Sequence, residues 1–317
     1  MKNLVGVNIT SPYQLLSLMS YYKANGSRYN CIVVYKYNAW GSEQISNLYL
    51  DYFHSIGGVL VEGLKGTPTI IKDIKRRFSP KEIDFVSVGK IDPLMSIFFR
   101  KSRRVVIADG FGSYGSVYSF YKAIRREGQS VNVYCLYAVF HYTLKSIFNS
   151  LIKSESYAFH NLKTMEEDNR FASEFKLVCR EIGPIEDGVM GDRKVLLVAE
   201  QPLVKLGLLT NSEYGDILCR IKRYAEENNL QLILKKHPSE NFTSKEPFDY
   251  ISNARIVEDI CINSPNITHV VSHSSSSLFN LTVLNEEINV ISFLCELPPI
   301  LSSKQKKLFS KIRLENF

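Results

Sequence analysis

The segment Gln231-Leu232-Ile233-Leu234-Lys235-Lys236-His237-Pro238 has the pattern of a short apolar strand that ends in two lysines and a His-Pro pair. Proline cannot extend the hydrogen-bond ladder of a strand, and it holds the residue before it in an extended conformation. A helical pattern from Ser212 to about Asn228 precedes this strand, and another apolar strand, Lys194–Ala199, precedes that helix. Strand, helix and strand in this order predict a parallel sheet.

The same alternation begins at the amino terminus of the chain. We expect strands at Val5–Asn8, Cys31–Tyr35, Val59–Val61, Phe85–Val88 and Val105–Ala108, with helices between them. Ser11 and Pro12 are typical of a helix start, and Asn25-Gly26 of its end. Later strands are expected at His269–Val271 and at Asn289–Phe293, the latter being the last strand, with a helix at Leu278–Leu284 before it.

Glycine, proline and aspartate concentrate between residues 183 and 193, which predicts a domain boundary there. We therefore expect an amino-terminal domain at 1–185, a carboxy-terminal domain at 190–300 and a basic tail at 301–317. The chain has 317 residues and is 45% hydrophobic, which is enough for two domains with separate cores. The fold class expected is α/β, with two Rossmann-like parallel-sheet domains facing a central cleft.

The chain has a formal net charge of +7, and residues 70–128 contain 13 Lys and Arg against 6 Asp and Glu. This excess equals that of the whole chain, so the basic character is local. One interpretation is that these residues complement helix dipoles at solvated helix ends. The other is attraction to anionic lipid head groups or to a polyanionic acceptor. No recognition helix or aromatic-interleaved motif accompanies the charge, so we expect no nucleic-acid partner.

Six cysteines are scattered without the close pairs that metal sites or redox motifs use, which is typical of a reducing cytoplasm (Cys31, Cys135, Cys179, Cys219, Cys261 and Cys295). No apolar stretch approaches the roughly 18 residues needed to cross a bilayer. The opening of the chain does not resemble a secretory signal. We expect a cytoplasmic protein that can contact the inner membrane peripherally.

A phosphate site is expected where His237 follows its strand. An imidazolium there can hydrogen-bond a phosphate oxygen and can protonate a leaving group, and Lys235 and Lys236 add positive charge. The segment Val270-Val271-Ser272-His273-Ser274-Ser275-Ser276-Ser277 supplies hydroxyls, and backbone N–H groups if Ser275–Ser277 open the next helix. We expect these two strand ends to be adjacent. The alternatives are a structural histidine in a loop and an ordinary helix cap, and His273 is a further candidate ligand.

A general base is expected at Asp109, which ends an apolar strand and precedes Gly110. Glycine at this position lets backbone and substrate approach closely. An ordinary Asp-Gly turn is the alternative interpretation. A rival acidic pair, Glu186 and Asp187 before Gly188, falls in the expected linker. The chain lacks an Asp-X-Asp triplet, a phosphate loop and a His-Glu-X-X-His motif, so we expect no metal ligands.

These residues resemble the bacterial sialyltransferase families, which include the lipooligosaccharide sialyltransferases and the capsule polysialyltransferases. Three signatures mark the families: an acidic-acidic-glycine triplet, Lys-X-His-Pro and a serine-rich motif. They correspond here to Ala108-Asp109-Gly110, Lys235-Lys236-His237-Pro238 and Ser274–Ser277, and Val195–Leu203 is similar to the families' entry into the nucleotide-binding domain. The resemblance runs from about residue 100 to 293. Ala108 departs from the pattern, because the families have an acid there.

The resemblance implies a GT-B fold, in which the first domain faces the acceptor and the second binds the CMP-sugar. It implies an inverting, metal-independent sialyltransferase that moves sialic acid from CMP-sialic acid to a galactose-containing acceptor and needs no cofactor. Asp109 would be the base, unless Glu186 replaces it, and His237 would assist departure of the CMP phosphate. Donor contacts would come from Lys235, Pro238, Ser274, Ser275 and Ser276, with Gly110 beside the base and Glu258 on the ribose hydroxyls.

Such an enzyme would build a bacterial surface glycan (O-antigen, lipooligosaccharide or capsule) on a lipid-linked acceptor, near an anionic membrane. Two other functions stay open at this point. One is a different nucleotide-sugar enzyme of the same fold, either a transferase or an epimerase. The other is a non-catalytic partner in the same pathway, for which the replacement of Asp109 or His237 would have no effect.

Overall fold

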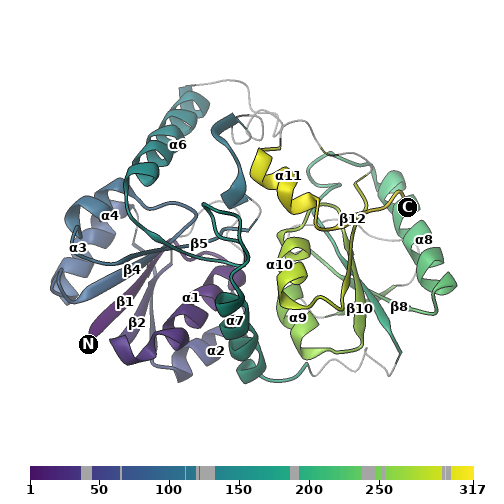
Figure 1. Cartoon of the computed structure of the whole chain (residues 1–317), viewed down its shortest axis with the longest axis horizontal. Coiled ribbons are helices and arrows are strands. Elements are labelled where there is room, and N and C mark those ends of the chain that lie inside the picture. The colour runs from purple at the N-terminus through teal and green to yellow at the C-terminus, as the bar shows by residue number, and fades with distance from the viewer. Residues whose placement is uncertain are drawn as a thin grey trace. The chain divides into compact units, whose positions relative to one another are not determined.

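The computed structural model of the 317-residue chain describes all residues except 37–44, 65, 111, 119–120, 122–132, 186–192, 238–247, 252–253, 295–296 and 298–300. Two compact units make up the chain, Met1–Ile182 and Gly183–Phe317. Each unit has its own six-stranded sheet with helices on its faces (Figure 1). The α/β class predicted from the strand–helix alternation is confirmed.

The sheet of the first unit has the order β3-β2-β1-β4-β5-β6. Its strands are β1 (Lys2–Val7), β2 (Tyr29–Tyr35), β3 (Gly58–Val61), β4 (Ile83–Val88), β5 (Arg104–Ile107) and β6 (Glu155–Tyr157). Every neighbouring pair is parallel. The carboxyl ends of all six strands therefore meet at one edge of the sheet, where such folds place their ligands.

Six helices of the first unit are α1 (Pro12–Ala24), α2 (Asn47–Ser55), α3 (Thr67–Arg77), α4 (Pro93–Phe98), α6 (Val133–Leu151) and α7 (Asn169–Ile182). Helices α1, α2 and α7 contact one another, as do α3 and α4, on the other side of the sheet (Figure 1). Helix α1 begins and ends where Ser11 and Asn25 predicted. Ser46 is the residue that precedes α2.

Gly6 lets α1 pack closely on β1. A Cβ atom at this position would lie 2.5 Å from Cδ2 of Leu18, a buried residue of α1. A side chain at position 6 would force Leu18 to shift and would disturb the packing of α1 on the sheet.

The sheet of the second unit has the order β12-β11-β10-β7-β8-β9 and is also parallel throughout. Its strands are β7 (Val195–Ala199), β8 (Gln231–Lys235), β9 (Asp249–Ile251), β10 (Ile267–Ser272), β11 (Asn289–Ser292) and β12 (Arg313–Leu314). Its helices are α8 (Asn211–Glu227), α9 (Val257–Asn263), α10 (Ser276–Leu284) and α11 (Ser303–Phe309). The core on the α8 side includes Tyr214 and Leu218 of α8 and Leu196 of β7.

The basic tail predicted at 301–317 is wrong, and so is the prediction that Asn289–Phe293 is the last strand. This segment forms α11 and then β12, which pairs with β11. Phe279 of α10 and Phe309 of α11 pack edge to face, and Phe317 joins the α8 core. The apolar residues at positions 308, 309, 312 and 317 are the signal that separates a folded segment from a solvated tail.

The two strand ends that carry His237 and the serines are separated by a strand, so the prediction that they are adjacent is wrong. Strand β7 lies between β8 and β10, and its last residue, Ala199, pairs with Lys235 of β8. Neighbouring strands lie about 4.8 Å apart, which places the ends of β8 and β10 roughly 10 Å from each other. A ligand that contacts both ends must reach across the end of β7.

Candidate active site

Asp109 lies at the carboxyl edge of the first sheet, two residues after β5. Its backbone N–H donates to Oγ of Ser113, 2.5 Å away, which folds the following residues into a tight loop. The buried side chain of Tyr114 holds this loop in place, because its hydroxyl donates to the carbonyl of His160 at 2.9 Å. Gly110 has a φ of +66°, a conformation that glycine adopts without strain. The loop therefore presents Asp109 at a defined position.

The carboxyl group of Asp109 is accessible and has a raised pKa. The residue is exposed, so a substrate can reach it. Surrounding protein atoms still desolvate the carboxylate, and this raises the pKa of Asp109 above its ordinary value, while a hydrogen bond from Gln14 opposes the rise. A carboxylate with a raised pKa accepts a proton more readily than an ordinary one.

Gln14 is a buried partner of Asp109 that the sequence analysis did not identify. Its Nε2 donates to Oδ1 of Asp109. Its Oε1 accepts from the backbone N–H of Thr10 at 2.7 Å and from that of Ser11 at 3.2 Å. Gln14 is thus the third helical residue of a capping box with Ser11, the helix start motif, and the motif fixes which end of the amide faces Asp109.

Ala108 is the position at which the chain departs from the acidic-acidic-glycine triplet. Its side chain is buried, with 2% of its surface exposed, whereas Asp109 next to it is exposed. Adjacent residues of an extended segment point to opposite sides. An acid at position 108 would therefore point into the protein. The exposed carboxylate of Asp109 is present although position 108 is alanine. The rival acids Glu186 and Asp187 lie outside the described residues.

At the carboxyl edge of the second sheet, Lys235 is the last residue of β8 and His237 follows two residues later. Lys235 is buried to 8% exposure, and His237 is half-buried. Pro238 lies outside the described residues. The carbonyl of Lys235 accepts from the N–H of Glu200 at 3.0 Å, so the chain leaving β7 follows the end of β8 for one more residue. Both basic side chains belong to the edge where a ligand of such a sheet binds.

The serine run forms the start of α10, which begins at Ser276, two residues before the helix predicted at Leu278–Leu284. Ser275 is the N-cap, and its Oγ accepts from the N–H of Ser277 at 3.3 Å. Ser274 and Ser276 are half-buried and flank this cap. The first N–H groups of a helix have no partner within the helix, and they attract anions. The serine hydroxyls and the first backbone N–H groups of α10 are therefore donors at the same helix start.

His273 does not contribute positive charge to this edge near neutral pH. Burial lowers its pKa to about 4, so the ring is neutral. The ring packs against Phe293, with centroids 5.4 Å apart, and its Nδ1 lies 3.0 Å from Oγ of Ser274. His273 orients a serine of the run in this geometry.

Glu258 is buried in the first turn of α9, with 2% of its surface exposed, and is not a surface loop acid. Its Oε1 accepts from Nδ2 of Asn280 in α10 at 2.6 Å. Burial raises the pKa of Glu258, and its contacts with Asn280, Ser277 and Lys235 oppose the rise. The carboxylate therefore connects the starts of α9 and α10. A contact with ribose hydroxyls stays a prediction, and it would require Glu258 to keep an accessible oxygen.

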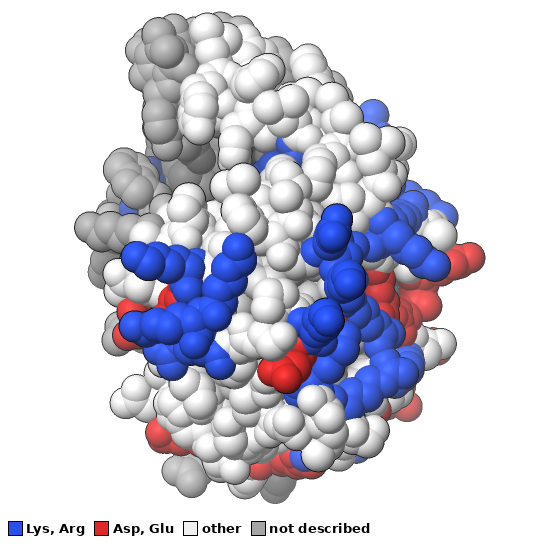
Figure 2. Space-filling model, turned by 90° about the vertical axis from the view of Figure 1, so that its left-hand side faces the viewer, with Lys and Arg blue, Asp and Glu red and all other residues white. Residues whose placement is uncertain are grey.

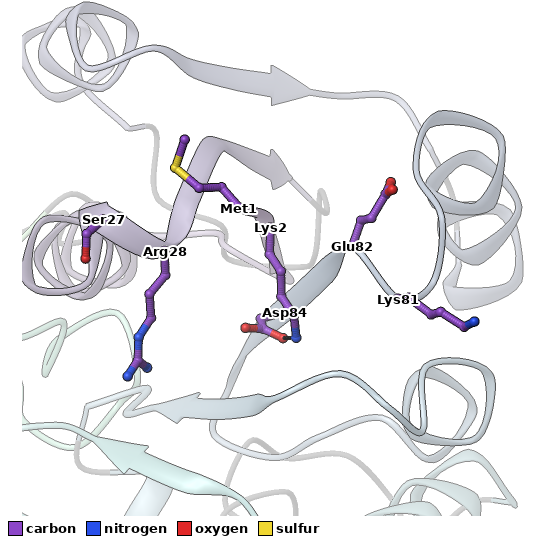
Figure 3. Close-up of a pocket in the computed structure, with 7 residues that line it drawn as sticks. All are labelled: Met1, Lys2, Ser27, Arg28, Lys81, Glu82 and Asp84. Carbon is purple, nitrogen blue, oxygen red and sulfur yellow. Dashed lines mark hydrogen bonds and ion pairs between the residues drawn. The ribbon is translucent and has the colours of Figure 1, made fainter.

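A hollow of the first unit lies at the amino edge of the sheet, opposite the edge that carries Asp109. Figure 3 shows its lining, which includes Met1, Arg28 and Glu82. Asp84 in its wall binds Nζ of Lys2 at 2.6 Å and accepts from the N–H of Arg103 at 2.9 Å. These contacts join the starts of three strands, so we assign this hollow a structural role. In the described part of the chain, no group of three His, Cys, Asp or Glu could hold a metal ion.

Comparison with known proteins adds a family and a fold. A family model described as alpha-2,8-polysialyltransferase (POLYST) matches residues 99–294, more than half of the chain and the whole range from Asp109 to Ser277. No curated protein matches the sequence significantly.

Solved structures share the fold at low identity. An alpha/beta-galactoside alpha-2,3-sialyltransferase from Photobacterium phosphoreum has a TM-score of 0.54 at 14% identity, over 99% of this chain and 99% of the other. A UDP-GlcNAc 2-epimerase from Methanocaldococcus jannaschii has a TM-score of 0.56 at 10% identity, over 98% and 91% of the two chains. The predicted GT-B fold is confirmed, and at these identities the structures show the fold alone.

Proposed function

The chain belongs to the alpha-2,8-polysialyltransferase family (POLYST), and on this premise we propose that it transfers sialic acid from CMP-sialic acid to a galactose-containing acceptor. The proposed reaction inverts the anomeric carbon, uses no metal and contributes to a bacterial surface glycan. The acceptor oxygen attacks the anomeric carbon while the bond from that carbon to the phosphate oxygen of CMP breaks. The acceptor proton goes to Asp109.

The observation that carries this proposal is the environment of Asp109. A base for a sugar hydroxyl must be accessible, held in position and basic enough to take the proton. Asp109 is exposed, is held by Ser113 and Gln14, and has a pKa that is raised because surrounding protein atoms desolvate its carboxylate. It also lies within the range matched by the family model. These properties support Asp109 as the base over an ordinary turn aspartate.

The second unit supplies the groups that would receive the departing CMP. Lys235 and His237 would provide positive charge and a proton donor to the phosphate, and Ser274, Ser275 and Ser276 would provide hydroxyl donors. The strand order supports a ligand that extends over the end of β7, because the two sets of residues flank that strand. A nucleotide with its phosphate is long enough for this span of roughly 10 Å.

A different nucleotide-sugar enzyme is the alternative, and the fold does not separate the two, since an epimerase with a TM-score of 0.56 shares it. The family match favours the sialyltransferase. The discriminating experiment incubates the purified chain with CMP-sialic acid, UDP-GlcNAc or a GDP-sugar, each with a panel of galactosides, and measures the nucleotide released. We expect release of CMP alone. Release of UDP or GDP, or conversion of UDP-GlcNAc into its epimer, would support the alternative and overturn the proposal.

The lipid-linked nature of the acceptor belongs to the proposal as well. Its test compares a short soluble galactoside with the same galactoside on a lipid anchor presented in vesicles. We expect a lower KM for the anchored form. Equal KM values for the two acceptors would contradict a preference for a lipid-linked acceptor. They would not contradict sialyl transfer itself.

A further inference from the structure

Helix α6 exposes its apolar face. Six large apolar side chains on it have between 46% and 79% of their surface exposed: Leu136, Tyr137, Phe140, Leu144, Ile147 and Leu151. At 3.6 residues per turn, these positions fall within an arc of about 100° on the helix surface. They form a continuous stripe along the described part of the helix, which we call the α6 stripe.

The opposite side of α6 faces the protein with polar groups. Asn149 accepts from the backbone N–H of Ile91 at 2.9 Å and donates to its carbonyl at 3.0 Å. Lys145 lies 3.7 Å from Asp92, and Nζ of Lys90 lies 3.2 Å from the ring centroid of Tyr142. A surface helix in water normally has the reverse orientation, with its apolar face inward. In water, this arrangement of α6 leaves the apolar side chains of the stripe in contact with solvent, which is unfavourable.

A second group of exposed apolar side chains lies on α4, whose first residues follow the Ile91–Asp92 segment that contacts the polar side of α6. Leu94, Ile97 and Phe98 of α4 are 42%, 61% and 46% exposed. Apolar patches of this extent are rare on monomeric proteins and mark interaction sites. We treat the α6 stripe and these three residues of the first unit together as the candidate docking surface.

Basic side chains border this surface. Nζ of Lys75 in α3 lies 3.9 Å from the ring centroid of Phe98 in α4, which places positive charge directly beside the apolar residues. Exposed lysines and arginines extend from there over α3 and the turn after α4: Lys72, Arg76, Arg77, Arg100 and Lys101. Figure 2 shows this side of the molecule, with groups of Lys and Arg separated by uncharged surface.

We propose that the α6 stripe and the exposed residues of α4 insert into the boundary between head groups and acyl chains of an anionic membrane. The border of lysines and arginines would then contact the lipid phosphates. Charge complementarity selects this occupant, because a second copy of the chain would bring a like-charged border against this one, whereas anionic lipids neutralise it. Apolar side chains combined with basic residues are the features of helices that lie in the membrane interface.

The insertion is parallel to the surface and does not span the bilayer. Among the described residues, no helix combines the length and the apolar composition that a membrane span requires. The proposal depends on exposed side chains and their charges and not on sialyl transfer, so each can fail while the other stands. If both hold, the surface would bring the first unit to acceptors that are anchored in the membrane.

The test is flotation of the full chain with vesicles of phosphatidylglycerol and phosphatidylethanolamine, compared with vesicles of phosphatidylcholine alone. We expect binding to the anionic vesicles that falls at least tenfold in the variant Phe140→Gln, Leu144→Gln, Ile147→Gln. The variant Lys75→Glu, Arg100→Glu, Lys101→Glu should also lose binding and its dependence on salt. All replaced side chains are exposed, and thermal unfolding serves as the check that each variant folds.

Matched controls come from the second unit. Leu206→Gln with Leu208→Gln removes two apolar side chains of similar exposure, and Lys306→Glu with Lys307→Glu reverses two exposed charges. Both controls should bind anionic vesicles like the unaltered chain. Equal binding by the α6 variant, or no binding by the unaltered chain, would overturn the proposal. A dimer in lipid-free solution that the α6 variant abolishes would also overturn it, since the occupant would then be a second copy.

Discussion

Gln14 connects the start of α1 to the candidate base, because its Nε2 donates to Oδ1 of Asp109. The other end of the same amide accepts from the N–H groups of Thr10 and Ser11. Rotating the amide would break three hydrogen bonds together. The capping box of α1 thereby fixes one donor on the carboxylate, and Gln14 is a positioning residue for Asp109.

Replacing Gln14 by alanine should lower kcat by about 10- to 100-fold, because a small displacement of a base weakens proton transfer strongly. The pH profile should move as well. Asp109 must be ionised to accept a proton, so activity falls as pH decreases through its pKa. Burial raises that pKa and the bond from Gln14 lowers it. Gln14→Ala should therefore move the acid limb of the kcat profile to higher pH.

The matched control for Gln14→Ala is Gln305→Ala. Gln305 is also a buried glutamine that closes a capping box, with Ser302 at the start of α11. Both variants should lose about 1 kcal/mol of stability from the cap, measured by thermal unfolding. Only Gln14→Ala should move the acid limb. A similar pH profile for both would show that Gln14 acts on stability alone.

Asp109→Asn keeps the shape of the side chain and removes its basicity, so transfer should fall by about 10²- to 10⁴-fold with little change in the KM for the donor. Glu186→Gln should leave the rate within about twofold. The measurement is the initial rate of CMP release with a fixed galactoside. An active Asp109→Asn protein together with an inactive Glu186→Gln protein would assign the base to Glu186.

Ala108→Asp restores the triplet pattern and should nevertheless reduce stability. The side chain at 108 is buried, and an unpaired carboxylate there is desolvated. We expect a loss of about 2 to 4 kcal/mol in chemical denaturation, and no gain in kcat for the folded fraction. Higher activity in this variant would mean that the first acid of the triplet has a catalytic role of its own.

His237→Ala should lower kcat by about 10²- to 10⁴-fold, because the departing phosphate loses its proton donor. The control is His269→Ala, which changes a half-buried histidine in the first half of β10, away from its carboxyl end, and should leave kcat within about twofold. The measurement is single-turnover transfer at saturating donor. Equal rates for the two variants would remove His237 from the leaving-group role.

Ser276→Ala should raise the KM for the donor by about 10-fold, because a hydroxyl donor to the phosphate is removed. Ser275→Ala should add a loss of about 1 kcal/mol in stability, since Ser275 caps α10. Ser302→Ala, which removes the N-cap of α11, provides the matched stability control. An unchanged donor KM in both Ser275→Ala and Ser276→Ala would place the phosphate elsewhere.

The alternation of strands and helices, and the exact start of α1, could be predicted because the signals are local. Ser11, Pro12 and Asn25 act through neighbouring backbone groups, and apolar runs mark buried parallel strands. The serine run could be assigned to the start of α10 for the same reason. Because the strands are parallel, their carboxyl ends must all lie at the same edge of the sheet.

The order of the strands could not be predicted in the same way, because it depends on contacts between distant segments. Nothing within β7 indicates that it separates β8 from β10. The bond between Gln14 and Asp109 joins residues 95 positions apart and is equally invisible in a local pattern. A Ser-X-X-Gln start of a helix that follows a first strand is the one signal that could have directed attention to Gln14. Burial of Glu258 depends on the packing of α9 against α10.

Sialyl transfer from CMP-sialic acid releases one CMP for each sugar transferred, so a mass balance tests it. The purified chain is incubated with CMP-sialic acid, a galactoside and EDTA, and both CMP and product are quantified by mass spectrometry. We expect one CMP for each sialyl residue found on the galactoside. No CMP release with any galactoside or with water, in a folded preparation, would contradict it.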